Sequence, residues 1–173
     1  QKLREVAKSA PSAPQVYSSL GMVFESMLTE IQGEKQAGGE LGQLQRRMEL
    51  AQKAYASYHI ASLLTKRDFV LWERSGDAAM RVAQLYTDII DSADVIGESD
   101  LSTKNTTSTP QKGFDPNSGA EKWCADRKLW VEHALSAYRS SDNLRPPGVN
   151  IPCKLAQVHM TLGNCIDALS ILT

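Results

Sequence analysis

Histidine and cysteine are the residue types best suited to metal or nucleophilic chemistry, and their spacing here matches no known site. His59 and His133 have no cysteine or carboxylate at the short spacing that zinc ligands use. The cysteines Cys124, Cys153 and Cys165 are odd in number and form no C-x-x-C pair, which indicates free thiols in a reducing cytosol or nucleus. We therefore predict no metal site and no cofactor.

Motifs for nucleophilic catalysis and for phosphate binding are also missing from the sequence. No serine lies in the G-x-S-x-G pattern that forms a nucleophile elbow. The four glycines between residues 33 and 42 are not followed by the Lys-Ser or Lys-Thr pair of a phosphate-binding loop, so they are typical of turns. We predict that the chain is not an enzyme, and we assign no catalytic residue.

Composition and charge exclude two further classes of function. The 173 residues carry 19 Lys and Arg against 20 Asp and Glu, for a formal net charge of −1. Proteins that grip DNA directly usually have a basic excess, because neutralising phosphates supplies much of the affinity, so we expect no direct nucleic-acid binding. No apolar run approaches the roughly 18 residues that span a bilayer, and we predict no membrane segment.

Large and small side chains recur in an order that predicts pairs of packed helices. Three stretches share a large residue, a small residue near it, and later an alanine or a second ring. The residues in these positions are Tyr17, Leu20, Gly21, Phe24 and Tyr58, then Trp72, Gly76 and Tyr138, then Leu155, Ala156, Gly163 and Ala168. The order resembles the tetratricopeptide repeat, a helix–turn–helix unit of about 34 residues. It implies an all-α, right-handed solenoid of antiparallel helix pairs with two long insertions.

The residue types at these positions have a physical reason. Large side chains such as Tyr17 and Trp72 fill the space between paired helices. Gly21 and Gly76 let the second helix of each pair approach closely, and Gly163 suits a helix end with a left-handed backbone. His159 occupies a ring position of the third repeat, where we expect it to be buried instead of catalytic.

The first two repeats are longer than the unit, and each contains an insertion between its two helices. The first insertion lies near residues 30–47, and the second lies near residues 92–120. The second is rich in Ser, Thr, Asn, Asp, Gly and Pro, so it has too little apolar surface to order itself and we expect disorder there.

The repeat pattern divides the chain into four parts. Because Gln1 and Thr173 fall inside predicted helices, we expect the sequence to be a segment of a longer protein. The parts are residues 1–11, ending a preceding repeat; 12–66, repeat one; 67–147, repeat two; and 148–173, a truncated repeat three.

The first helix of each repeat is expected to face a partner on the side away from the core residues Tyr17, Trp72 and Leu155. The mixed polar character of that side suits a protein interface more than a small-molecule pocket. The candidate partner-binding residues are Ser18, Met22, Glu25, Glu73, Asp77, Cys153 and Gln157.

Short strings in the chain resemble one family of tetratricopeptide proteins more than others. Residues 14–25 (PQVYSSLGMVFE), 58–63 (YHIASL) and 71–74 (LWER) are similar to the repeats of the tetratricopeptide subunit of transcription factor TFIIIC. The resemblance implies a nuclear scaffold without enzymatic activity. Its implied partners are TFIIIB subunits, other TFIIIC subunits and, through them, RNA polymerase III.

Two other functions stay open at the level of sequence. The first is a co-chaperone module that binds an acidic peptide tail, which needs Lys and Asn on the inner face of its first helix. Ser18 and Met22 stand at those places, and Arg74 and Lys154 are the suitably placed cations. The second is a purely structural stretch of a larger solenoid in splicing, RNA processing or trafficking.

Overall fold

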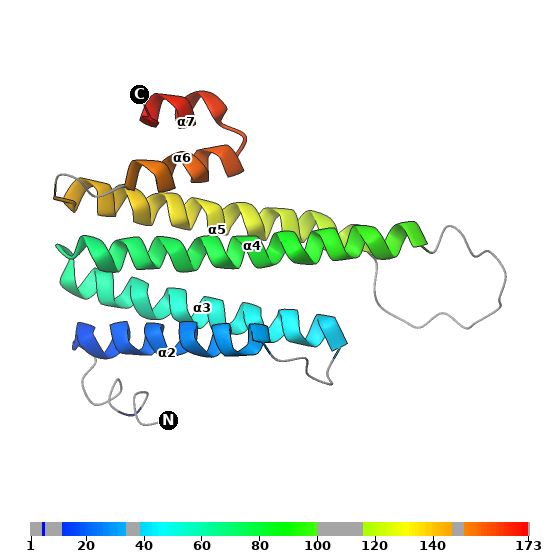
Figure 1. Cartoon of the computed structure of the whole chain (residues 1–173), viewed down its shortest axis with the longest axis horizontal. Helices are drawn as coiled ribbons and strands as arrows, with labels where there is room; N and C mark the ends of the chain where they lie inside the picture. Colours follow the sequence, from blue (N-terminus) through cyan, green and yellow to red (C-terminus); the bar gives the residue numbers. More distant parts are fainter. Residues whose placement is uncertain (1–4, 6–11, 34–38, 100–115, 147–150, 173) are drawn as a thin grey trace.

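The computed structural model describes residue 5 and residues 12–33, 39–99, 116–146 and 151–172 (Figure 1). Within these ranges the chain is all-helical and contains no strand, which confirms the predicted all-α class. The helices are α2 (Pro14–Gly33), α3 (Gly39–Thr65), α4 (Phe69–Ser99), α5 (Pro116–Leu144), α6 (Ile151–Thr161) and α7 (Cys165–Leu172).

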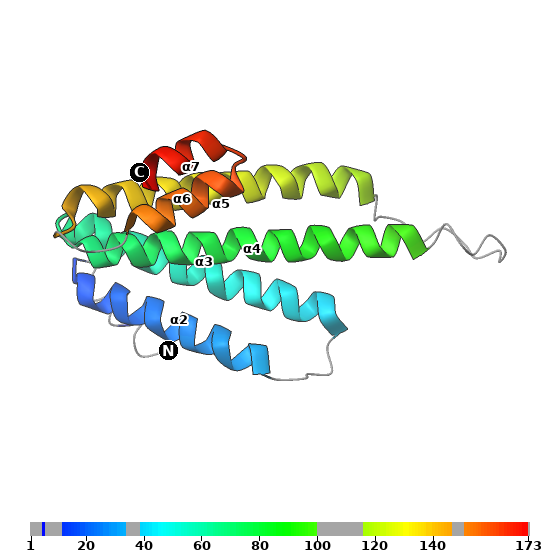
Figure 2. The same cartoon turned by 45° about the horizontal axis from the view of Figure 1, so that its top comes forward.

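Each helix packs against the helix that follows it in the sequence. Successive helices run in opposite directions, and the long helices α2 to α5 lie side by side with α6 and α7 at one end of the stack (Figures 1 and 2). The chain therefore forms an extended stack in which α2 and α7 lie at opposite ends.

The turns between helices follow from local chemistry. The Asp68 carboxylate accepts hydrogen bonds from the backbone N–H groups of Val70 (3.0 Å) and Leu71 (3.3 Å), which caps the start of α4. Lys66 has a φ of 36° just after α3 ends. Gly163 has a φ of 78° in the turn between α6 and α7, as its position after a helix predicts.

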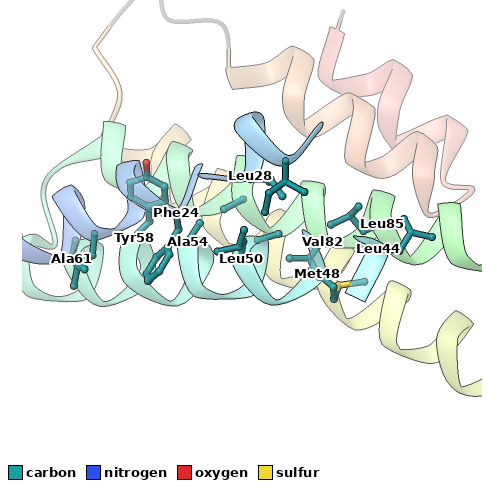
Figure 3. Packing of buried hydrophobic residues seen from close by; sticks show 14 of the residues in the cluster. Phe24, Leu28, Leu44, Met48, Leu50, Ala54, Tyr58, Ala61, Val82 and Leu85 are labelled. Carbon is teal, nitrogen blue, oxygen red and sulfur yellow. The ribbon is translucent and has the colours of Figure 1, made fainter. Parts of the chain in front are cut away.

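Two apolar cores meet at α4. Ala78, Val82 and Leu85 of α4 pack in a core with α2 and α3, shown in part in Figure 3, where Phe24 and Ala54 lie near Tyr58. The neighbouring positions Ala79 and Ala83 pack instead in a core with α5 and α6. Helix α4 joins the two cores because it is apolar on two faces.

The predicted repeat residues differ in how deeply their side chains are buried. Tyr17 and Trp72 are half-buried, and Gly163 is exposed in its turn. The remaining predicted positions are buried: Leu20, Gly21, Phe24, Tyr58, Gly76, Tyr138, Leu155, Ala156 and Ala168. His159 is also buried, with 6% of its surface exposed, as expected.

The predicted insertions differ from the structure in extent. Helices α2 and α3 together cover most of residues 30–47, so much of the first insertion lengthens these two helices. Residues 92–99 and 116–120 are helical, although their polar composition predicted disorder. Both segments continue helices whose remaining turns are anchored by packing, and helix propagation costs less than helix nucleation. Residues 100–115, and all of 1–11 except residue 5, lie outside the described residues.

Candidate functional site

An open groove of about 800 Å³ lies along α4. Its walls come mainly from the first helix of each antiparallel pair, namely α2, α4 and α6, with one residue each from α3 and α5. The residues that line it are Met22, Glu25, Arg47, Arg74, Asp77, Met80, Arg81, Gln84, Leu85, Asp88, Tyr138, Lys154 and Gln157.

At the α2 side of the groove, a buried tyrosine holds a carboxylate in place. The Tyr58 hydroxyl donates a 2.7 Å hydrogen bond to Glu25 Oε2. A Cβ added at Gly21 would lie 2.6 Å from Tyr58 Cε1, so the ring reaches this position only because residue 21 is a glycine. Burial, and then the Glu25 carboxylate, raise the pKa of Tyr58, so the hydroxyl stays protonated and donates.

The second helix pair, α4 and α5, repeats this construction. A Cβ added at Gly76 would lie 2.5 Å from Tyr138 Cε1, and the Tyr138 hydroxyl donates a 2.6 Å hydrogen bond to Asp77 Oδ1. Burial, and then the bond to Asp77, raise the pKa of Tyr138. In both pairs a glycine on the first helix admits a tyrosine from the second, and the tyrosine fixes a carboxylate of the groove.

Lys154 ties α6 to α4 through two carboxylates. Its Nζ donates to Asp77 Oδ1 (2.7 Å) and Oδ2 (2.8 Å), and it lies 2.7 Å from Glu73 Oε1. Burial lowers the pKa of Lys154, but the bonds to Asp77 and Glu73 outweigh it and raise that pKa above its usual value. The Lys154 charge is therefore already engaged within the chain.

Three arginines of the groove are less engaged. Arg81 Nη1 lies 3.7 Å from Glu25 Oε1, a long ion pair. The Arg74 guanidinium lies 5.8 Å from the centre of the Tyr58 ring, and its interaction with the Tyr58 hydroxyl opposes the rise in the pKa of Tyr58 that burial and Glu25 cause. Arg47 Nε is shielded from solvent and has no hydrogen-bond partner. Among the described residues, neither Arg47 nor Arg74 forms an ion pair with a carboxylate.

Four of the seven candidate partner-binding residues line this groove: Met22, Glu25, Asp77 and Gln157. Glu73 does not line it, but contributes by holding Lys154. That these residues bind a partner stays a prediction.

The other two candidates lie elsewhere. Ser18 lines a second, smaller hollow of about 240 Å³, together with Gln15, Ser19 and Asp68. Cys153 is exposed on α6 and is not among the residues that line the groove. The structure therefore brings Met22, Glu25, Asp77 and Gln157 together and separates Ser18 and Cys153 from them.

Sequence reasoning missed the greater part of the α4 wall. Met80, Arg81, Gln84, Leu85 and Asp88 continue from Asp77 at spacings of three and four residues, so they lie on one face of the helix. The same spacing of three and four residues is present in the sequence. Arg47 belongs to α3, the second helix of the first pair. No signal in the sequence indicated that this helix contributes to the groove.

A cluster of rings joins α3, α4 and α5. The Tyr55 ring stacks on His59 with centroids 5.3 Å apart, and it meets Trp130 edge-on at 5.0 Å. His133 lies 5.6 Å from Tyr55, and Trp72 lies 5.8 Å from His59. Burial, and then the nearby His133, lower the pKa of His59. The two histidines that lacked ligand spacing in the sequence thus serve in packing between the helix pairs.

Comparisons with known proteins do not assign the chain to a family. No protein-family model matches it, and no curated protein matches its sequence. In the part of the chain that the structure describes, no three His, Cys, Asp or Glu side chains gather where they could hold a metal ion. None of the described helices is both long and apolar enough to cross a bilayer.

Proposed function

We propose that the chain is a tetratricopeptide-like α-solenoid that acts as a protein-binding scaffold, without enzymatic activity, and that its groove holds a segment of a partner protein. The observation that carries the proposal is the construction shared by the two helix pairs. Gly21 and Tyr58 in the first pair correspond to Gly76 and Tyr138 in the second. Repeated helix pairs that contact their neighbours in sequence are typical of solenoids, whose stacked first helices offer an extended binding surface.

The composition of the groove supports a protein partner. Its walls combine flexible apolar side chains, such as Met22 and Met80, with charged and amide side chains from three helices. Methionine adapts its shape to irregular partners, and a wall of mixed polarity suits a peptide segment. A small-molecule site would have a mainly apolar lining with few polar groups.

The finer assignment is a TFIIIC-type subunit that recruits TFIIIB for RNA polymerase III transcription in the nucleus. Its support is the sequence resemblance of residues 14–25, 58–63 and 71–74. The net charge of the chain is close to zero, which also suits a subunit that acts through protein contacts, because direct binding to DNA favours an excess of basic residues.

Co-precipitation from nuclear extract tests this assignment. The tagged chain is compared with Gln84→Trp, which fills the groove at an exposed lining position, and with Gln45→Trp, an exposed position on α3 outside the groove. We expect TFIIIB subunits to be enriched by the wild type and by Gln45→Trp, but not by Gln84→Trp. No enrichment by the wild type would remove the TFIIIC assignment. Equal enrichment by all three would remove the groove from the proposal.

A further inference from the structure

The charged side chains that line the groove differ in whether they have hydrogen-bond or ion-pair partners within the chain. Glu25 accepts from Tyr58, and Asp77 accepts from Tyr138 and Lys154. Asp88 accepts a 3.2 Å hydrogen bond from the Gln84 side-chain amide. Each carboxylate on the groove wall therefore has a donor within the chain.

Two of the four cations that line the groove differ from Arg81 and Lys154, which pair with carboxylates. Arg47 and Arg74 line the groove without a carboxylate partner among the described residues, and Arg47 Nε is shielded from water with no hydrogen bond. A guanidinium has five N–H donors and is charged at every physiological pH. A shielded donor without an acceptor costs free energy, which a bound acceptor would recover.

We propose that the groove takes a peptide segment whose aspartate or glutamate side chains pair with Arg47 and Arg74 and whose apolar side chains contact Met22 and Met80. This inference rests on the proposed function and adds the chemistry of the partner. Carboxylates bind guanidinium groups through paired, charge-assisted hydrogen bonds. The apolar contacts come from Met22, which is 52% exposed, and from Met80 beside Asp77 on the same wall.

A basic segment fits the groove less well. It would have to compete with Tyr58, Tyr138 and Lys154 for the carboxylates that these residues already hold. It would also bring like charges to Arg47 and Arg74, which raises the free energy of the complex. The charge arrangement thus favours an acidic occupant.

The probe for the test is a phage-displayed library of random 16-residue peptides, selected on the full chain. Selected peptides are synthesised with a fluorescein label, and their dissociation constants are measured by fluorescence anisotropy. The chain variants are Arg47→Gln and Arg74→Gln, with Arg46→Gln as the matched control, since Arg46 is exposed next to Arg47 but does not line the groove. Gln84→Trp identifies the peptides that bind in the groove.

We expect the groove-binding peptides to be acidic and partly apolar. Each groove substitution should weaken them about 10-fold, the scale of one charge-assisted hydrogen bond, and Arg46→Gln should leave them unchanged. Replacing Asp and Glu of the peptide by Asn and Gln should have the same effect on the intact chain, which excludes misfolding of a variant as the cause.

Two other results are distinguishable from this one. If Gln84→Trp blocks the peptides but their Asp and Glu can be replaced without loss of affinity, the acidic partner is wrong and the scaffold proposal stands. If the selected peptides bind Gln84→Trp as well as the wild type, the groove is not their site and the proposed function fails with the inference.

Discussion

Gly21 and Tyr58 meet so closely that a single methyl group at residue 21 would lie 2.6 Å from the tyrosine ring. The contact lets α2 and α3 approach each other, and it places the Tyr58 hydroxyl beside the groove, where it holds Glu25. The same relationship links Gly76 to Tyr138 between α4 and α5. Helix packing and groove chemistry therefore depend on the same pair of residues in each half of the stack.

Substitution of Gly21 by alanine tests this contact. Since the added methyl group overlaps the Tyr58 ring, we expect Gly21→Ala to lower the free energy of unfolding by ~1–3 kcal/mol. Gly42→Ala is the control, because a Cβ at that helical position meets nothing within 4 Å. It should be neutral or stabilise by up to ~1 kcal/mol, as alanine favours helix. Urea unfolding measures both, and equal effects would show that Gly21 makes no close contact.

Loss of the Tyr138 hydroxyl is expected to destabilise the second helix pair. Tyr138→Phe leaves the Asp77 carboxylate with one donor fewer, which should lower the free energy of unfolding by ~1–3 kcal/mol. Tyr17→Phe is the control, since no hydrogen bond from the Tyr17 hydroxyl is found among the described residues, and it should change stability little. Thermal unfolding followed by circular dichroism compares the two. A Tyr138→Phe chain as stable as the wild type would contradict the bond.

Acidification is expected to destabilise the stack through His59. Burial and the nearby His133 lower the pKa of His59 in the folded chain, whereas in the unfolded chain it titrates near its ordinary value of about 6.5. The unfolded state then takes up a proton that the folded state resists. This contribution to stability is complete above about pH 6.5 and is lost as the pH falls through the folded pKa.

Urea unfolding between pH 8 and pH 5 measures that loss. His59→Phe keeps a ring against Tyr55 but removes the titrating group, so its free energy of unfolding should depend less on pH than that of the wild type. Identical pH profiles for the two chains would show that His59 does not carry the effect.

Lys154 is expected to hold α6 on α4. Lys154→Gln removes its ion pairs with Glu73 and Asp77, so amide hydrogen exchange in α6 and α7 should become faster. Lys53→Gln is the control, because within the described part of the chain Lys53 pairs only with Glu49 of its own helix, at an exposed site. Such surface pairs contribute little, about 0–1 kcal/mol. Exchange in α6 that stays as slow as in the wild type would contradict the role of Lys154.

The helical pattern of this chain was legible in its sequence because its signals are local. Gly163 ends a helix in the left-handed region, and apolar spacing of three and four residues marks the helices. The small residues Gly21 and Gly76 were predicted to permit close approach, and the rings that approach them are Tyr58 and Tyr138. Tyr17 and Trp72 were predicted to fill the space between helices; both are half-buried, Tyr17 packs against the core, and the Trp72 ring of α4 lies 5.8 Å from His59 of α3.

The groove was less predictable because it depends on contacts between distant segments. Lys154 of α6 forms an ion pair with Asp77 of α4. No local sequence pattern predicts which cation pairs with a given carboxylate. Arg47 reaches the groove from α3 because that helix is extended toward its amino-terminal end, in a stretch that the sequence indicated as an insertion. Polar composition suggested disorder in residues 92–99, where helix propagation from the packed part of α4 prevails.

The groove along α4 is proposed to receive a partner segment. Photo-crosslinking tests where such a segment binds: a peptide selected on the full chain carries a benzophenone group, and mass spectrometry maps the residues to which it attaches. We predict attachment to Met22, Met80 and Gln157, which line the groove on three different helices. Attachment instead to Leu63 and Leu129, which are exposed on α3 and α5 and do not line the groove, would show that the segment binds elsewhere.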